Sequence, residues 1–148
     1  MSSFIGEFPC KVDPKGRIML PSALKRQMPS DAKDTFVIKK DIYSKCLVIY
    51  PLNEWERQNE ILRSKINPYN KEHALFMREF HRGTAEVELD NTNRMLIPKR
   101  LLDIVEIKSD VVLAGIDSKI ELWAKEIYDQ NAQNEDDFAA LASKILGS

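Results

Sequence analysis

The chain carries one short motif twice, about half its length apart. Residues 13–24 read DPKGRIMLPSAL, and residues 90–101 read DNTNRMLIPKRL. Aspartate, arginine, proline and leucine stand at matching positions, and three apolar residues separate the arginine from the proline in both copies. The duplication predicts two related halves, and because each half is too small to bury its apolar face alone, we expect them to share one core.

The similarity continues beyond the motif. Segments rich in β-branched and other apolar residues predict strands at 35–39 and 46–50 in the first half and at 111–115 and 120–123 in the second. A helix-like segment follows the last strand of each half. Each half therefore predicts the order strand, turn, strand, short helix, strand, strand, helix.

Prolines mark the starts of the two short helices. Pro21 and Pro98 suit the first position of a helix, where a missing N–H costs no hydrogen bond. Leu24 in the first half and Leu101 in the second then fall on the side of the helix that faces the core.

Two amphipathic segments connect the halves, and a third follows them. Apolar residues at helical spacing predict one helix over 52–66, which an Asn-Pro pair breaks, and a second over 74–80, with Gly83 placed to cap its end. In the tail, residues 136–146 combine an apolar stripe with acidic residues and predict a further helix.

These elements predict a mainly β protein with α-helices, in the α+β class. We expect a compact β-barrel of interleaved hairpins, built from two tandem pseudo-twofold halves and flanked by helices. Residues 1–66 would form the first half, residues 67–128 the second half with its connecting helix, and residues 129–148 an acidic, partly helical tail.

Charge is nearly balanced over the whole chain but unevenly distributed along it. The formal net charge is −1, which argues against an indiscriminate nucleic-acid binder. Residues 1–28 hold five basic residues against two acids, whereas residues 110–148 hold three lysines against eight acids. One end is therefore basic and the other acidic, although solvated surface with chance clustering would give the same pattern.

Other bulk features point to the cytoplasm. No apolar run approaches the roughly 20 residues that span a bilayer, and the first residues lack the basic and apolar regions of a signal peptide. Cys10 and Cys46 lie far apart in strand-like segments, so we expect reduced, buried thiols.

The repeated turn has a defined backbone chemistry. Asp13 begins the first turn, Pro14 presets φ at the second position, and Gly16 supplies a left-handed residue at the fourth. The second turn begins with Asp90 and has Asn93 in place of the glycine, and asparagine is among the side chains that best tolerate the left-handed region. The two copies thus preserve one backbone shape while most side chains change.

Basic residues gather around both turns. Lys15 lies at the tip of the first turn and Lys25 follows on the next helix, while Lys99 and Arg100 follow Arg94 in the second copy. An Asp–Arg pair that merely staples each turn, with the arginine solvated, would explain the motif in isolation. The clustering of cations in a slightly acidic chain favours a surface that presents positive charge at two related places.

These features resemble the MraZ family of bacterial transcription regulators, which consist of two tandem AbrB-like swapped-hairpin modules. The resemblance rests on the two Asp-x-x-x-Arg motifs and on the segments at 4–8, 46–51, 80–90 and 120–123. It implies a cytoplasmic, nucleoid-associated, ring-shaped homo-oligomer that binds double-stranded DNA. The expected targets are short direct repeats upstream of the division and cell-wall gene cluster.

The resemblance also implies site residues. Carried over by motif position, Arg17 is the main expected DNA contact, Lys15 is its neighbour, and Arg94 is the counterpart in the second copy. The remaining expected contacts and the residues expected to shape the turns are Lys25, Lys99 and Arg100, and Asp13, Gly16, Asp90 and Asn93. Ile5 stands where the family leads us to expect a basic residue, and the neutral tip at 91–93 predicts unequal contributions from the two turns.

Two other classes of function compete with DNA binding. An enzyme is not expected, because His73 and His81 are two helical turns apart with no third ligand at a metal spacing, and no cofactor motif is present. The stronger alternative is a protein-interaction or antitoxin-like module that binds a partner through the acidic tail, residues 129–148. A tail helix that is already formed in the free protein would argue against folding triggered by such a partner.

Overall fold

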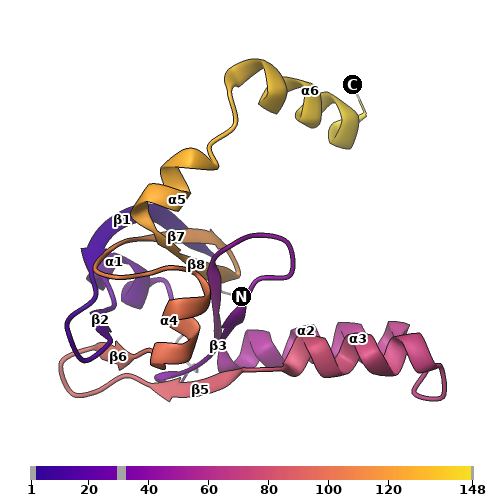
Figure 1. The fold of residues 1–148 in the computed structure, drawn as a ribbon, viewed down its shortest axis with the longest axis horizontal. Helices are drawn as coiled ribbons and strands as arrows, with labels where there is room; N and C mark the ends of the chain where they lie inside the picture. The colour runs from indigo at the N-terminus through magenta and orange to yellow at the C-terminus, as the bar shows by residue number, and fades with distance from the viewer. Residues whose placement is uncertain (1–2, 30–32, 148) are drawn as a thin grey trace.

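A β-rich body carries two helical projections in this computed structural model, which describes residues 3–29 and 33–147. The helical hairpin and the C-terminal helix extend from different sides of the body (Figure 1). The first half contains β1 (Phe4–Lys11), β2 (Arg17–Met19), α1 (Ser22–Arg26), β3 (Thr35–Lys40), β4 (Leu47–Pro51) and α2 (Leu52–Lys65). The second half and the tail contain α3 (Lys71–His81), β5 (Ala85–Glu88), β6 (Arg94–Leu96), α4 (Lys99–Ile104), β7 (Asp110–Asp117), β8 (Lys119–Ala124), α5 (Lys125–Gln130) and α6 (Glu135–Leu146).

The element order predicted for each half is confirmed. Strand, turn, strand, short helix, strand, strand and helix follow one another from β1 to α2 and again from β5 to α5. The helix that precedes β5, α3, connects the two series, and a left-handed residue, Gly83 with φ +74°, follows its end as expected.

The main sheet interleaves the two halves. Its strand order is β1-β7-β8-β4-β3-β5, and all its pairings are antiparallel. The first strand of each half lies on the third strand of the other: β1 pairs with β7, from Phe4 opposite Asp117 to Lys11 opposite Asp110, and β5 pairs with β3. The β4–β8 pair lies at the centre of the sheet. Each strand of the first half and its counterpart in the second half lie at equal distances from this centre, which confirms the expected pseudo-twofold α+β fold.

A second, two-stranded ribbon brings the two repeated motifs together. β2 and β6 pair antiparallel, with Arg17 opposite Leu96 and Met19 opposite Arg94. Ile18 and Met95, at the middle of the ribbon, are buried in the common core. Both turns therefore emerge from one ribbon, at the side of the body away from the α2–α3 hairpin (Figure 1).

The short helices bury matching leucines but begin one residue later than expected. Leu24 of α1 and Leu101 of α4 are almost fully buried, which confirms that they face inward. Pro21 and Pro98 have extended ψ values of 140° and 134° and occupy the N-cap, not the first helical position. The restricted φ of proline suits either position, so the spacing of the sequence could not separate them.

Aromatic stacking and one histidine join α2 to α3. The rings of Trp55 and Phe80 stack with centroids 5.8 Å apart. The Nε2 atom of His81 lies 2.7 Å from Asn59 Oδ1, and its Nδ1 atom lies 2.8 Å from the carbonyl oxygen of Met77. His81 is therefore a structural bridge between the helices.

The tail helix α6 is well capped but packs on nothing in the described chain. The Asn134 side chain accepts a hydrogen bond from the Asp137 N–H at 2.8 Å, and Gly147, with φ +73°, ends the helix. Its apolar stripe is nevertheless exposed, at Phe138, Leu141 and Ile145. Within the described residues, no helix is long and apolar enough to cross a membrane.

The two cysteines differ in exposure. Cys46 is fully buried, and burial raises the pKa of its thiol to about 12. Cys10 is only half-buried, although burial also raises its pKa. The expectation of buried thiols therefore holds for Cys46 and only partly for Cys10.

Candidate nucleic-acid interface

The first turn is held by the side chain of its own first residue. Asp13 Oδ1 accepts hydrogen bonds from the N–H groups of Lys15 and Arg17, at 2.9 and 2.8 Å. Asp13 Oδ2 accepts the Nε–H of Arg17 at 2.6 Å. The backbone closes the turn through Gly16 N–H to Asp13 O and Asp13 N–H to Arg17 O, both 2.9 Å long. One aspartate thus fixes both the turn and the arginine.

The second turn repeats these bonds atom for atom. Asp90 Oδ1 accepts the N–H groups of Thr92 and Arg94, at 2.8 and 3.0 Å, and Asp90 Oδ2 accepts the Nε–H of Arg94 at 3.2 Å. Asn93 adopts the left-handed conformation expected of it, with φ +61°. Thr92 adds a hydroxyl bond to Asp90 Oδ1 at 2.8 Å, which Lys15 of the first turn cannot supply.

Cross-links between the turns make them one unit. The Leu20 N–H donates to Asn93 O, and the Ile97 N–H donates to Gly16 O, both at 2.9 Å. Gly16 has φ +90°, and a Cβ built there would lie only 2.9 Å from Ile97 O. Glycine is therefore required at this position both for its backbone conformation and for the close approach of the other half.

Both arginines bond to their aspartates through Nε alone. Each guanidinium uses Nε for its aspartate, and within residues 3–29 and 33–147 no hydrogen bond engages the terminal amino groups of Arg17 or Arg94. About one third of each side chain is exposed, 33% for Arg17 and 35% for Arg94. A guanidinium held in this way presents a planar fork, the geometry that recognises phosphate or guanine in a bidentate manner.

The hydrogen bonds that shape the turns also perturb acidity. The N–H of Arg94 and the Thr92 hydroxyl lower the pKa of Asp90 to about 2, and the N–H of Arg17 lowers the pKa of Asp13 in the same direction. A carboxyl with a depressed pKa stabilises the fold above its unfolded pKa and loses that contribution as pH falls through its folded pKa.

We therefore expect the second turn to open between about pH 4 and pH 2. The Nε–H signal of Arg94, followed by ¹H–¹⁵N NMR, should be protected from exchange above this window and lose its protection within it. An Asp90→Asn variant, which has no carboxyl to titrate, should show no transition there. The same acid transition in both proteins would assign it to other carboxyls.

The other predicted contacts are placed unequally. Lys25 pairs with Asp34, and Arg100 donates to Gly83 O at 3.3 Å. Lys99 is 88% exposed and only loosely paired, 4.0 Å from Asp103. The sequence places Lys99 close to Arg94 in the second copy, whereas in the structure it lies beside the first turn, where it lines an open hollow of about 430 Å³ with Lys15 and Lys108.

Sequence reasoning missed Lys108. It lies in the α4–β7 loop, far from both motifs in sequence, and no pattern around it marks it. Only the pairing of β1 with β7 brings this loop to the first turn, through the Val12 N–H, which donates to Ser109 O at 2.9 Å. The position of Lys108 beside the first turn therefore depends on strand pairing, which the local sequence does not encode.

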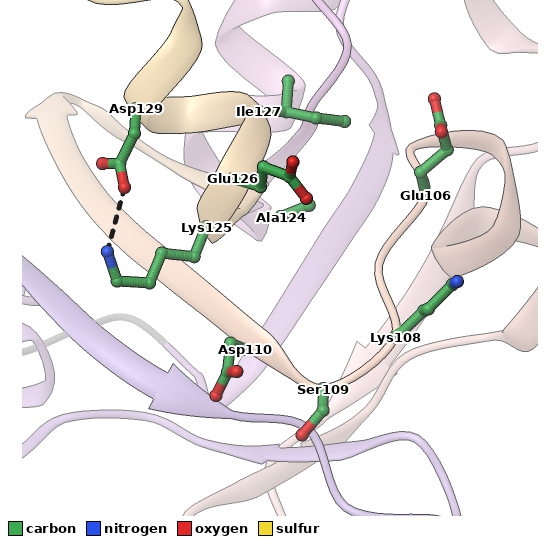
Figure 2. Close-up of a pocket in the computed structure, with 9 residues that line it drawn as sticks. All are labelled: Glu106, Lys108, Ser109, Asp110, Ala124, Lys125, Glu126, Ile127 and Asp129. Carbon is green, nitrogen blue, oxygen red and sulfur yellow. Dashed lines mark hydrogen bonds and ion pairs between the residues drawn. The ribbon is translucent and has the colours of Figure 1, made fainter.

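A neighbouring hollow has a different character. It has a volume of about 530 Å³ and lies where the α4–β7 loop faces α5 (Figure 2). Its lining mixes signs, and Lys125 and Asp129 pair across 2.9 Å within it. Two lysines, Lys108 and Lys125, stand against four acids in the lining, so this hollow has no positive excess that would attract DNA.

The histidines do not gather into a metal site in the part of the chain that the structure describes. No group of three or more His, Cys, Asp or Glu residues there could hold a metal ion. The Nδ1 atom of His73 accepts the Asn67 N–H at 2.9 Å, so this histidine supports the link between α2 and α3.

The comparisons with known proteins agree with the duplication. The family model described as "MraZ protein, putative antitoxin-like" matches the chain twice, over residues 3–79 and 80–147. A transcriptional regulator MraZ of Christiangramia forsetii is 39% identical over 151 residues, which cover 100% of this chain and 96% of the relative. Proteins of the same name from Phocaeicola vulgatus and Clostridium beijerinckii are each 37% identical, and the matches cover 98% and 96% of this chain and 94% and 96% of the relatives.

Each family match contains one copy of the Asp–Arg turn and the strands around it. The first match spans the turn at Asp13 and the second spans the turn at Asp90. The relatives extend over the full length of both halves, so the likeness is not confined to the turns. The chain is therefore a member of the MraZ family.

Proposed function

We propose that this protein is a sequence-specific DNA-binding regulator of transcription that meets DNA with its two Asp–Arg turns. One observation carries the proposal: two arginines, each fixed by an aspartate through Nε, emerge from a single ribbon with their terminal nitrogens available. The names of the relatives, all transcriptional regulators, support it.

The chemistry of the turn suits recognition of base edges. The terminal nitrogens of Arg17 can donate together to O6 and N7 of a guanine in the major groove, the commonest specific contact between proteins and DNA. Because Asp13 holds the arginine in place before DNA arrives, little side-chain freedom is lost on binding. Lysines around the turn act as point charges on phosphates and set the register.

The finer features follow from the charge of the subunit. With a net charge of −1, one subunit attracts DNA weakly. We propose that a homo-oligomeric ring presents several turns to short direct repeats upstream of the protein's own gene, in the division and cell-wall gene cluster. Linked contacts of this kind raise avidity by roughly 10²–10⁴. A cytoplasmic, nucleoid-associated location accords with this activity.

Fluorescence anisotropy at several salt concentrations tests the proposal. We expect tight binding to DNA from upstream of the gene and weaker binding to a shuffled duplex of the same composition. The affinity should fall steeply with salt, with a log–log slope of about −0.9 for each phosphate neutralised. Equal affinity for the two duplexes would exclude sequence-specific binding, and a flat salt response would exclude the phosphate contacts.

The alternative function, capture of a partner by a tail that folds on binding, is less well supported. Glu135–Leu146 is already a capped helix in the single chain. Partner-triggered folding would instead require this segment to be unstructured before the partner arrives.

A further inference from the structure

The hollow beside the first turn collects cations from both halves of the chain. Lys15 comes from the β1–β2 turn of the first half, whereas Lys99 and Lys108 come from α4 and the α4–β7 loop of the second. The floor is apolar, because Val12 and Ile107, which also line it, are buried. The lining thus combines three lysines with two aspartates, Asp13 and Asp103, and its net charge of +1 favours an anion.

The acidic residues at this hollow are already engaged. Both carboxylate oxygens of Asp13 accept hydrogen bonds from its own turn and from the Arg17 side chain. Asp103 lies 4.0 Å from Lys99, a loose and exposed pair. Only Lys99 of the three lysines has a carboxylate partner here, and the hollow with the adjoining Arg17 carries a positive excess.

Lys108 is held at the hollow without a partner of its own. Its two neighbours are fixed, since the Ile107 N–H donates to Leu102 O and Ser109 O accepts the Val12 N–H, both at 2.9 Å. In the described part of the chain Lys108 makes no ion pair within 4.0 Å, and the nearby acids Glu106 and Asp110 pair with Lys45 and Lys11. Figure 2 shows its side chain directed away from the Lys125–Asp129 pair.

We propose that this hollow seats one phosphate of the DNA backbone, and that Lys108 is a DNA contact supplied by the second half to the turn of the first. The inference rests on the proposed DNA-binding function and adds to it a composite site. Phosphate is the fitting ligand, because lysines recognise it as point charges, whereas a base edge favours a planar fork such as that of Arg17.

The first test compares Lys108→Gln with Lys71→Gln in anisotropy titrations over a range of salt. Both changes remove one exposed positive charge, but Lys71 lies at the start of α3 on the projecting hairpin. Lys108→Gln should weaken binding to the operator and to a shuffled duplex by the same factor and reduce the salt slope by about 1. Lys71→Gln should match the wild type.

A second test identifies the phosphate. Neutral methylphosphonate linkages are placed one at a time along the operator, and the affinity of each protein is measured for each duplex. At one of the linkages that weaken binding of the wild type, the affinity of Lys108→Gln should not fall further. If Lys108→Gln instead loses affinity at every linkage as the wild type does, Lys108 touches no single phosphate and the inference fails.

The outcomes separate this inference from the function on which it rests. If the wild type prefers the operator and Arg17→Ala loses that preference, but Lys108→Gln behaves like Lys71→Gln, DNA binding stands and the composite site is wrong. If the wild type binds neither the operator nor the shuffled duplex, both are wrong. If inorganic phosphate binds the wild type but not Lys108→Gln, and saturating phosphate displaces DNA no more than chloride does at equal ionic strength, the hollow is a site for free phosphate and the DNA contact is overturned.

Discussion

Replacing Arg17 with alanine is expected to abolish most of the operator preference of the protein. A bidentate contact to guanine contributes about 1–3 kcal/mol of discrimination, or roughly 5- to 150-fold in affinity at each turn. If several subunits bind together, these losses accumulate across the turns that touch the duplex. Anisotropy with operator and shuffled duplexes measures the ratio directly.

The matched variant Arg17→Lys separates charge from geometry. Lysine keeps the positive charge but lacks the planar fork and the Nε–H that Asp13 accepts. We expect Arg17→Lys to retain much of the salt-dependent affinity and to lose the preference for the operator. Full preference in either variant would show that Arg17 does not read the sequence, and Arg94→Ala then becomes the informative change.

Replacing Gly115 with alanine is expected to be the most destabilising single-methyl change in the sheet. A Cβ built on Gly115 would lie 2.6 Å from the carbonyl carbon of Phe4 and 2.8 Å from the nitrogen of Ile5. These are backbone atoms of β1, so no side chain can move aside, and the two strands must separate. Overpacking costs about 1–3 kcal/mol, and occasionally more, in the free energy of unfolding.

Urea or thermal unfolding measures this loss, with Ile116→Ala as the control. Ile116 is the next residue of β7, lies opposite Ile5 and is 45% exposed, so its truncation disturbs the same strand without forcing it off β1. We expect Gly115→Ala to lower Tm by roughly 2–12 °C and Ile116→Ala to have a smaller effect. Equal stability of Gly115→Ala and the wild type would mean that β1 does not lie on β7 as closely as described.

The conformation of the two turns could be predicted from the sequence, because it depends on hydrogen bonds between residues that are close in the chain. Asp13 bonds to atoms within four residues of itself, and Gly16 and Asn93 supply the left-handed residue of their own turns. The duplication predicts the element order for the same reason, since each copy repeats its own strand and helix signals. Such features depend on short-range hydrogen bonds and on backbone preferences.

Long-range pairing could not be predicted from the same signals. The apolar residues of β3 and β7 are equally compatible with a first strand from their own half or from the other, because both choices bury the same side chains. Gly115 meets the backbone of Phe4, and the loop of Lys108 meets the first turn, only when β1 pairs with β7. The same limit applies to α6: Phe138 and Leu141 have the spacing of a packed helix, but burial depends on a partner that the local sequence does not specify.

The interleaving of the sheet sets the order in which a nascent chain can fold. The ribosome synthesises β1 about a hundred residues before β7, so Phe4 has no pairing partner until Asp117 has been made. At about 5–20 residues per second, this delay lasts roughly 5–20 s. β3 meets the same problem on one edge, since β5 follows only after both hairpin helices. β3 can pair with β5 once residue 88 has been made, whereas β1 has no partner until residues 110–117 follow. The unpaired edges of β1 therefore need protection from neighbouring chains during most of synthesis.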